Sequence, residues 1–141
     1  MSQVFLTRRE RFNAAHRMFR PGWSDEENMQ IYGKCSNPNW HGHNYILFVT
    51  VKGNVNPEIG YTVNLKTLSK IINQYIIDPL DHKNINVEVD FMNGIIPSSE
   101  NLAMAIWHQL LPHVRTLGVE LHCVKIEETE NNFVEYFGEK N

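Results

Sequence analysis

Residues Asn44–Val51 read NYILFVTV and carry the strongest strand signal in the chain. In an extended segment, alternate side chains point to opposite faces. Here both alternating sets are apolar: Tyr45, Leu47, Val49 and Val51 on one face, Ile46 and Phe48 on the other. This pattern is typical of a strand that is covered on both faces of its sheet. The segment therefore predicts a core on one face and a further cover, most simply another subunit, on the other.

The flanking sequence predicts three more strands and two helices. The strands are expected over residues 4–12, 120–128 and 133–137, the last two joined by a short turn through Asn131 and Asn132. The helices fall between the second and third strands, whereas residues 21–38, rich in Gly, Asp, Asn and Ser, are expected to form a long loop. The order strand, strand, helix, helix, strand, strand favours an α+β fold, with a four-stranded antiparallel sheet and two helices on one face.

The helices are predicted from the spacing of apolar residues and from their end signals. In the first, Asn64 is a candidate N-cap and Pro79 is expected to prevent continuation beyond Asp78. The second should begin near Ser98 or Ser99, with Glu100 in its first turn. The expected buried stripes are Leu65, Leu68, Ile71, Ile72, Tyr75 and Ile76 in the first helix and Leu102, Ala103, Ile106, Trp107 and Leu110 in the second.

Length, charge and cysteine content narrow the class of protein. The 141 residues suit one domain spanning residues 1–141. A net charge of −3 argues against a nucleic-acid partner, and no apolar run approaches a membrane span. The N-terminus lacks the apolar core of a signal peptide, and two cysteines are too few for a disulfide scaffold. We therefore expect a cytoplasmic protein with no membrane contact.

Three histidines form a candidate metal site. His41 and His43 flank Gly42 just before the strongest strand, and residues two apart in an extended chain face the same side. His16 follows the first predicted strand and completes the set if the first two strands pair. Three imidazoles with no fourth protein ligand are typical of a catalytic zinc. The alternative is three unrelated polar histidines near strand ends; a cupin-like site is disfavoured because no glutamate closely follows His43.

Three further groups are candidates for proton transfer or ligand binding. Cys35 lies in the predicted loop, where it would serve as a base or nucleophile near a bound cation, or be an inert loop cysteine. Asp81 and His82 are adjacent and could polarise a third group, or simply form a polar loop after the helix. Glu128 shares its strand face with apolar neighbours. Either the face is assigned wrongly, or Glu128 is a buried acceptor for the N–H groups of a ligand.

The chain resembles the 6-pyruvoyltetrahydropterin synthase family in five ordered blocks. These are FNAAH at 12–16, GKCSNPNWHGHNY at 33–45, LDHKNIN at 80–86, SSENLA at 98–103 and ETENN at 128–132. The resemblance runs on to FGE at 137–139 and so covers nearly the whole chain. It implies a ββααββ tunnelling fold whose trimers close a barrel and stack into hexamers.

The resemblance also implies roles for individual residues. His16, His41 and His43 match the family's zinc ligands, and Cys35 matches its proton-abstracting cysteine. The remaining matches are Asp81 and His82 to the relay pair, Glu128 to the pterin anchor, and Ser98, Ser99 and Glu100 to positions beside the pterin. Trp40 is bulkier than the small residue expected before the first histidine of the pair, and residues 23–30 match nothing specific.

The implied activity is zinc-dependent conversion of 7,8-dihydroneopterin triphosphate to 6-pyruvoyl-tetrahydropterin, with loss of triphosphate, in tetrahydrobiopterin biosynthesis. Related enzymes that make 6-carboxytetrahydropterin usually place three residues between the cysteine and the histidine pair, whereas here five separate Cys35 from His41. A non-catalytic pterin-binding protein or a structural zinc oligomer is the alternative from another class. No nicotinamide or flavin is expected, consistent with the lack of a GxGxxG motif.

Overall fold

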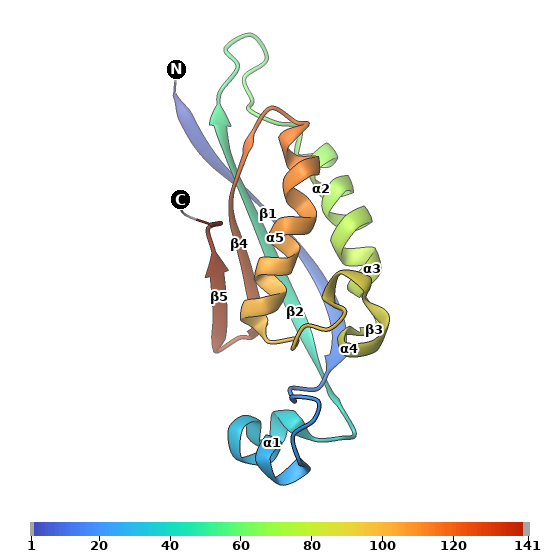
Figure 1. The fold of residues 1–141 in the computed structure, drawn as a ribbon. Coiled ribbons are helices and arrows are strands. Elements are labelled where there is room, and N and C mark those ends of the chain that lie inside the picture. The colour runs from blue at the N-terminus through green and yellow to red at the C-terminus, as the bar shows by residue number, and fades with distance from the viewer. Residues whose placement is uncertain (1, 140–141) are drawn as a thin grey trace.

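A single mixed sheet organises the computed structural model, which describes residues 2–139 (Figure 1). The strand order is β3-β1-β2-β4-β5. The strands are β1 (Gln3–His16), β2 (His41–Asn54), β3 (Lys83–Asn84), β4 (Glu120–Thr129) and β5 (Asn132–Tyr136). The α+β class and the four predicted strands are confirmed, but the sheet has a fifth strand. β3 pairs in parallel with β1 at Ala14 and Ala15, and two residues are too short to leave a periodicity in the sequence.

Strands β1 and β2 form one long antiparallel ladder. The register runs without a break from Gln3 opposite Asn54 to His16 opposite His41. Both strands are longer than the sequence predicted. Their outer parts carry polar and small side chains, which hide the hydrophobic alternation but do not prevent backbone pairing.

The principal helices lie on the same face of the sheet (Figure 1). The helical segments are α1 (Asp25–Tyr32), η1 (Gly33–Ser36), α2 (Leu65–Ile72), the π-turn η2 (Asn73–Ile77), α3 (Asp78–Leu80), α4 (Ile85–Glu88), η3 (Asp90–Met92) and α5 (Ser99–Arg115). The predicted N-caps are confirmed, because Asn64 accepts from the backbone of Lys66 and Ser98 accepts from that of Asn101.

The first helical run ends later than predicted. It passes through the π-turn η2 and continues to Leu80, so Pro79 does not stop it at Asp78. The proline stands in the first turn of α3, where its missing N–H costs little.

The predicted loop over residues 21–38 contains α1, so this part of the prediction is wrong. Its residues form no apolar stripe, which is why no helical period was visible. Polar contacts hold it instead. Ser24 caps the helix by accepting from Glu27, and the buried amide of Asn28 accepts from the backbone N–H of Arg20.

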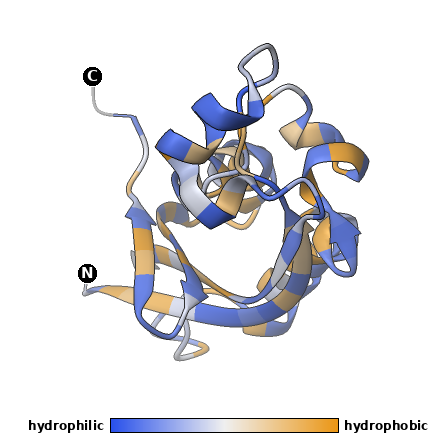
Figure 2. Cartoon of the chain, turned by 90° about the horizontal axis from the view of Figure 1, so that it is seen from below, coloured by the Kyte–Doolittle hydropathy of each residue, from blue (hydrophilic) through white to orange (hydrophobic). Residues whose placement is uncertain are grey.

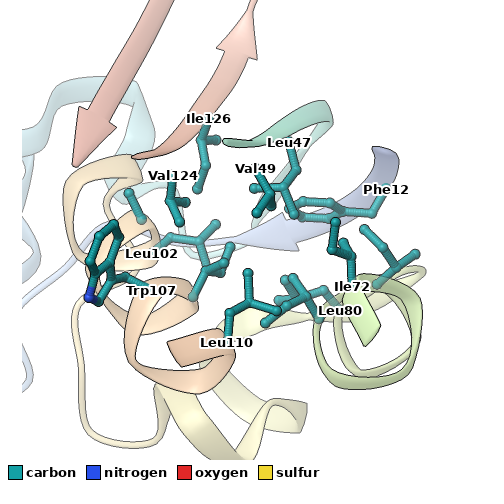
Figure 3. Close-up of a cluster of buried hydrophobic side chains, with 14 of the residues drawn as sticks. Phe12, Leu47, Val49, Ile72, Leu80, Leu102, Trp107, Leu110, Val124 and Ile126 are labelled. Atoms are coloured by element: carbon teal, nitrogen blue, oxygen red, sulfur yellow. The ribbon is translucent and has the colours of Figure 1, made fainter. Parts of the chain in front are cut away.

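The core lies between the sheet and the helices (Figure 3). Leu47 and Val49 of β2 are fully buried there, together with Ile72, Leu102 and Leu110 from the helices. Burial alternates from residue to residue along β1 and β2, and Figure 2 shows hydrophobic and hydrophilic residues interspersed along the sheet. The opposite face of the sheet carries aromatic side chains that the chain itself leaves partly or largely exposed, namely Phe5, Phe48 and Phe133.

None of the helices within residues 2–139 is long and apolar enough to cross a membrane.

Leu47→Ala tests which face of β2 is the core. Deleting most of a fully buried leucine is expected to lower the free energy of unfolding by about 2–5 kcal/mol, because it loses transfer energy and leaves a cavity. Urea denaturation measures this loss. Ile59→Ala, at a residue that is 57% exposed, is the control and should change stability by less than about 0.5 kcal/mol. Equal effects of the two substitutions would contradict the assignment of the core.

Candidate metal centre and substrate cavity

The β1–β2 ladder brings the three predicted metal ligands together. His16 pairs directly with His41 in the last register position, and His43 lies two residues further along β2 on the same face. The ring centroids are 4.5 to 5.0 Å apart, and one nitrogen from each residue lies within 4.8 Å of the others. These three residues could therefore hold one metal ion.

The hydrogen bonds of the histidines fit that reading. The Nδ1–H of His16 donates to the carbonyl oxygen of Pro97 at 2.8 Å, which leaves its Nε2 with a free lone pair. Within the described residues, this Nε2, both ring nitrogens of His41 and Nε2 of His43 are buried without a hydrogen-bond partner. Buried polar atoms are rarely left unpaired, and a cation bound by one nitrogen from each ring would satisfy three of these four atoms.

The surroundings of His16 and His41 favour neutral imidazoles. Burial lowers the pKa of His16, and the nearby His41 lowers it further. Burial also lowers the pKa of His41, helped by the neighbouring His43. A metal ligand must present a deprotonated nitrogen, so this environment suits coordination.

Glu128 points toward the same place. Its Oε1 lies 3.5 Å from Nε2 of His43, and its Oε2 accepts a hydrogen bond from the Ser99 hydroxyl at 2.7 Å. The β4–β5 register shifts between Glu127 and Thr129, so Glu128 lies at an irregularity in the ladder. Despite this irregularity, the contacts with Ser99 and His43 place the carboxylate on the side of the sheet where α5 begins, so its face was not misassigned.

One cavity of about 390 Å³ joins His16, Ser99 and Glu128 to Cys35. Its polar lining comes from His16, Cys35, Ser98, Ser99, Glu100, Glu128 and Asn132, and its apolar lining from Met18, Ile31, Tyr32, Phe133 and Val134. Sequence reasoning missed the apolar wall, whose members Ile31 and Tyr32 belong to the unpredicted helix α1. Trp40, expected to affect the pocket, is absent from this lining among the described residues; it adopts φ +66°, a conformation that is strained for a bulky side chain.

Asp81 and His82 contact each other but lie outside that cavity. Asp81 Oδ2 is 3.0 Å from His82 Nδ1, and Asp81 Oδ1 accepts the backbone N–H of Asn13 at 2.9 Å. The bond from Asn13 lowers the pKa of Asp81. This pair belongs to the β3 side of β1, whereas the Cys35 cavity is walled by β5, the opposite edge strand. One chain therefore does not bring His82 and Cys35 into the same cavity.

Together, the fold and these side chains define an α+β protein with a candidate metal centre that opens into a cavity for a small molecule. The model of the family 6-pyruvoyl tetrahydropterin synthase matches residues 5–139. The chain is 48% identical to a 6-pyruvoyl tetrahydrobiopterin synthase from Dictyostelium discoideum, over 96% of this chain and 97% of that protein. It is 44% identical to the protein of the same name from Homo sapiens, over 97% of this chain and 93% of that protein.

A solved structure is similar over the whole chain. The 6-pyruvoyl tetrahydropterin synthase of Caenorhabditis elegans superposes with a TM-score of 0.90 at 35% identity, covering 99% of this chain and 98% of that one. The chain therefore belongs to the 6-pyruvoyl tetrahydropterin synthase family, a family of enzymes in pterin biosynthesis.

Acidification should destabilise the metal-free protein. The unfolded histidines take up protons near the ordinary value of 6.5, whereas the lowered pKa values of His16 and His41 keep the folded imidazoles neutral at lower pH. The unfolded state therefore binds more protons below pH 6.5, and the free energy of unfolding should fall as the pH drops through this range. Urea denaturation of chelator-treated protein at several pH values measures the slope. His16→Gln should flatten it, and a stability that rises on acidification would contradict the argument.

Proposed function

We propose that the protein is a zinc-dependent enzyme that converts 7,8-dihydroneopterin triphosphate to 6-pyruvoyl-tetrahydropterin and releases triphosphate, in tetrahydrobiopterin biosynthesis. The observation that carries the proposal is one cavity whose wall combines the unpartnered nitrogen of His16 with Glu128 and Cys35. Residues 1–141 would act as one domain. The expected cytoplasmic location stays a prediction.

Zinc is the metal that the ligand set favours. Three neutral imidazoles without a fourth protein ligand leave one coordination position for substrate, the usual arrangement of catalytic zinc. When bound, the ion would polarise the oxygen atoms of the pterin side chain and so acidify the neighbouring C–H bonds. The Pro97 carbonyl holds the His16 ring in the tautomer that presents Nε2.

The other side chains of the cavity suit the remaining tasks. The Glu128 carboxylate would accept paired N–H groups of the pterin ring, and the Ser99 hydroxyl orients it. Ser98 and Glu100 lie beside Ser99 at the start of α5 and would contact the same ring. Cys35 is exposed to the cavity, where its thiolate would remove a carbon-bound proton from the substrate. The proton then stays on the sulfur until the next transfer step.

The relay pair points to a shared site. Asp81 and His82 do not line the cavity of Cys35, which is walled by β5 at the far edge of the sheet from β3, so a neighbouring copy would bring its own pair to this cavity. Both edge strands of the sheet are short, and its second face carries the exposed Phe5 and Phe133. Joining the sheets of several subunits edge to edge would pair the edge strands. Closing the joined sheets into a barrel would turn the apolar face inward. We therefore propose a trimeric barrel in the tunnelling-fold manner, stacked into a hexamer.

Two other functions remain as alternatives. A 6-carboxytetrahydropterin synthase would release acetaldehyde as well as triphosphate, and the five residues between Cys35 and His41 argue against it. A non-catalytic pterin-binding or structural zinc oligomer would bind ligand or metal without turnover. The presence of an exposed thiol in the cavity favours the enzyme.

The function is tested by giving 7,8-dihydroneopterin triphosphate to the zinc-loaded protein and measuring triphosphate release and the pterin product. We expect release with a 6-pyruvoyl product and no acetaldehyde. Cys35→Ala should keep zinc and pterin but lose turnover by roughly 100-fold or more, because it removes the proposed base.

A separate substitution tests the proposed metal ligands. His43→Ala should lower zinc content, measured by elemental analysis, because it removes one of three ligands. His108→Ala, outside the cluster, is the matched control and should keep its zinc. Loss of metal from Cys35→Ala would instead make the cysteine a fourth ligand, and wild-type protein that binds zinc but releases no triphosphate would refute the proposed reaction.

A shared site predicts complementation between two inactive variants. In co-expressed oligomers of Cys35→Ala and His82→Ala, random assembly gives about a quarter of sites an intact cysteine and an intact neighbouring histidine. The mixed oligomers should therefore show roughly a quarter of the wild-type activity, whereas oligomers of each variant alone should stay inactive. Sedimentation should show a trimer or hexamer. No recovery in mixed oligomers, or an active species near the monomer mass of 16.5 kDa, would contradict the shared site.

A further inference from the structure

Asn86 forms a two-way hydrogen bond with the backbone of Arg17. The N–H of Arg17 donates to Asn86 Oδ1 at 2.9 Å, and Asn86 Nδ2 donates to the carbonyl oxygen of Arg17 at 2.9 Å. The side-chain amide thus imitates a β-sheet partner for one residue. Asn86 belongs to α4, where its own N–H is held by the Asn84 side chain, and it does not line the Cys35 cavity.

Arg17 is the first residue beyond the β1–β2 ladder. The last ladder pair is His16 with His41, so Arg17 and Met18 have no partner in the described sheet. Without Asn86, both backbone groups of Arg17 would have to find water or remain unpaired. The side-chain amide therefore continues the path of β1 by one residue past the point at which strand pairing ends.

Arg17 and Met18 in turn bind the segment that contains Cys35. The N–H of Met18 donates to the carbonyl oxygen of Cys35 at 2.8 Å. The Nε of Arg17 donates to the carbonyl oxygen of Ser36 at 2.7 Å, and its guanidinium stacks on Phe19, with 4.1 Å between Cζ and the ring centroid. The backbone carbonyl groups of Cys35 and of the residue that follows it are thus tied to Met18 and Arg17.

The metal ligand next to Arg17 is held independently. His16 is fixed by its ladder pairing with His41 and by its bond to the Pro97 carbonyl, neither of which involves Asn86. Glu128 and Ser99 come from β4 and α5, far along the chain. Loosening Arg17 should therefore move the thiol while leaving the metal ligands and the pterin anchor in place.

We infer that Asn86 is a positioning residue that holds Cys35 at the metal cavity through the backbone of Arg17 and Met18. The inference rests on the proposed function for its kinetic consequence, because Cys35 must lie near the carbon atom from which it removes a proton. A displacement of about 1 Å at a reacting group can cost roughly 100-fold in rate.

The test compares Asn86→Ala, Asn86→Asp and a control. Asn86→Ala removes both bonds to Arg17, whereas Asn86→Asp keeps the acceptor for the Arg17 N–H and loses the donor. Asn73→Ala is the control: it deletes a half-buried amide that donates to the Ser69 carbonyl oxygen at 2.9 Å, in a helix away from the cavity. We expect kcat to fall by roughly 10- to 100-fold in Asn86→Ala and by less in Asn86→Asp, with KM and zinc content within about twofold of wild type.

A second readout separates this inference from the proposed reaction. Hydrogen exchange in zinc-loaded protein should speed up in residues 17–20 and 33–37 of Asn86→Ala but not in the helix α5, and neopterin binding, measured by fluorescence, should be unchanged. Wild-type protein without triphosphate release would refute the proposed function, and the exchange pattern would still decide the role of Asn86. Equal kcat in Asn86→Ala and Asn73→Ala, exchange that rises throughout the chain, or parallel loss of zinc would overturn the inference. If Asn86→Ala does not fold, Asn86→Asp decides by the same measurements.

Discussion

The register of the β1–β2 ladder is the constraint on which the fold and the site both depend. Residues Phe12, Ala14 and His16 of β1 share one face, and they lie opposite Tyr45, His43 and His41 of β2. Phe12 and Tyr45 stack in the core with ring centroids 4.8 Å apart. A slip of one residue would turn these aromatic rings out of the core. The packing that stabilises the fold therefore also enforces the pairing that gathers the histidines.

The start of α5 is the second fixed element. Pro97 accepts the His16 Nδ1–H, Ser98 caps the helix, and Ser99 holds Glu128. Three consecutive residues thus connect a candidate metal ligand, a helix end and the carboxylate of the cavity. An N-cap of this kind contributes about 1 kcal/mol. Because Ser98 lies between Pro97 and Ser99, the bond that fixes the start of the helix also fixes the backbone from which both neighbouring contacts are made.

Much of this arrangement could be predicted from sequence, and the remainder could not for physical reasons. The strand at residues 44–51, the caps Asn64 and Ser98 and the pair of His41 and His43 follow from local pattern. His16 joins that pair only through the long-range pairing of β1 with β2. Helix α1 could not be predicted, because polar bonds of Asn28 and Ser24 rather than an apolar stripe hold it. Strand β3 is too short for any period. The separation of His82 from Cys35 depends on which edge of the sheet each loop meets, and sequence spacing carries no such information.

The open face of the sheet refines the expectation that β2 needs a second cover. Ile46 and Phe48 are only partly exposed, and long cationic side chains lie over the ring of Phe48. The Nζ of Lys125 is 4.9 Å from the Phe48 centroid and 4.1 Å from that of Phe133, and Arg9 Cζ is 6.0 Å from Phe48. Cations stacked in this way shield apolar surface while keeping their charge in water. The apolar face alone is therefore a weaker argument for the proposed assembly than the position of His82, which does not line the cavity of Cys35. Stacked cations can cover an aromatic ring, but they leave that position unchanged.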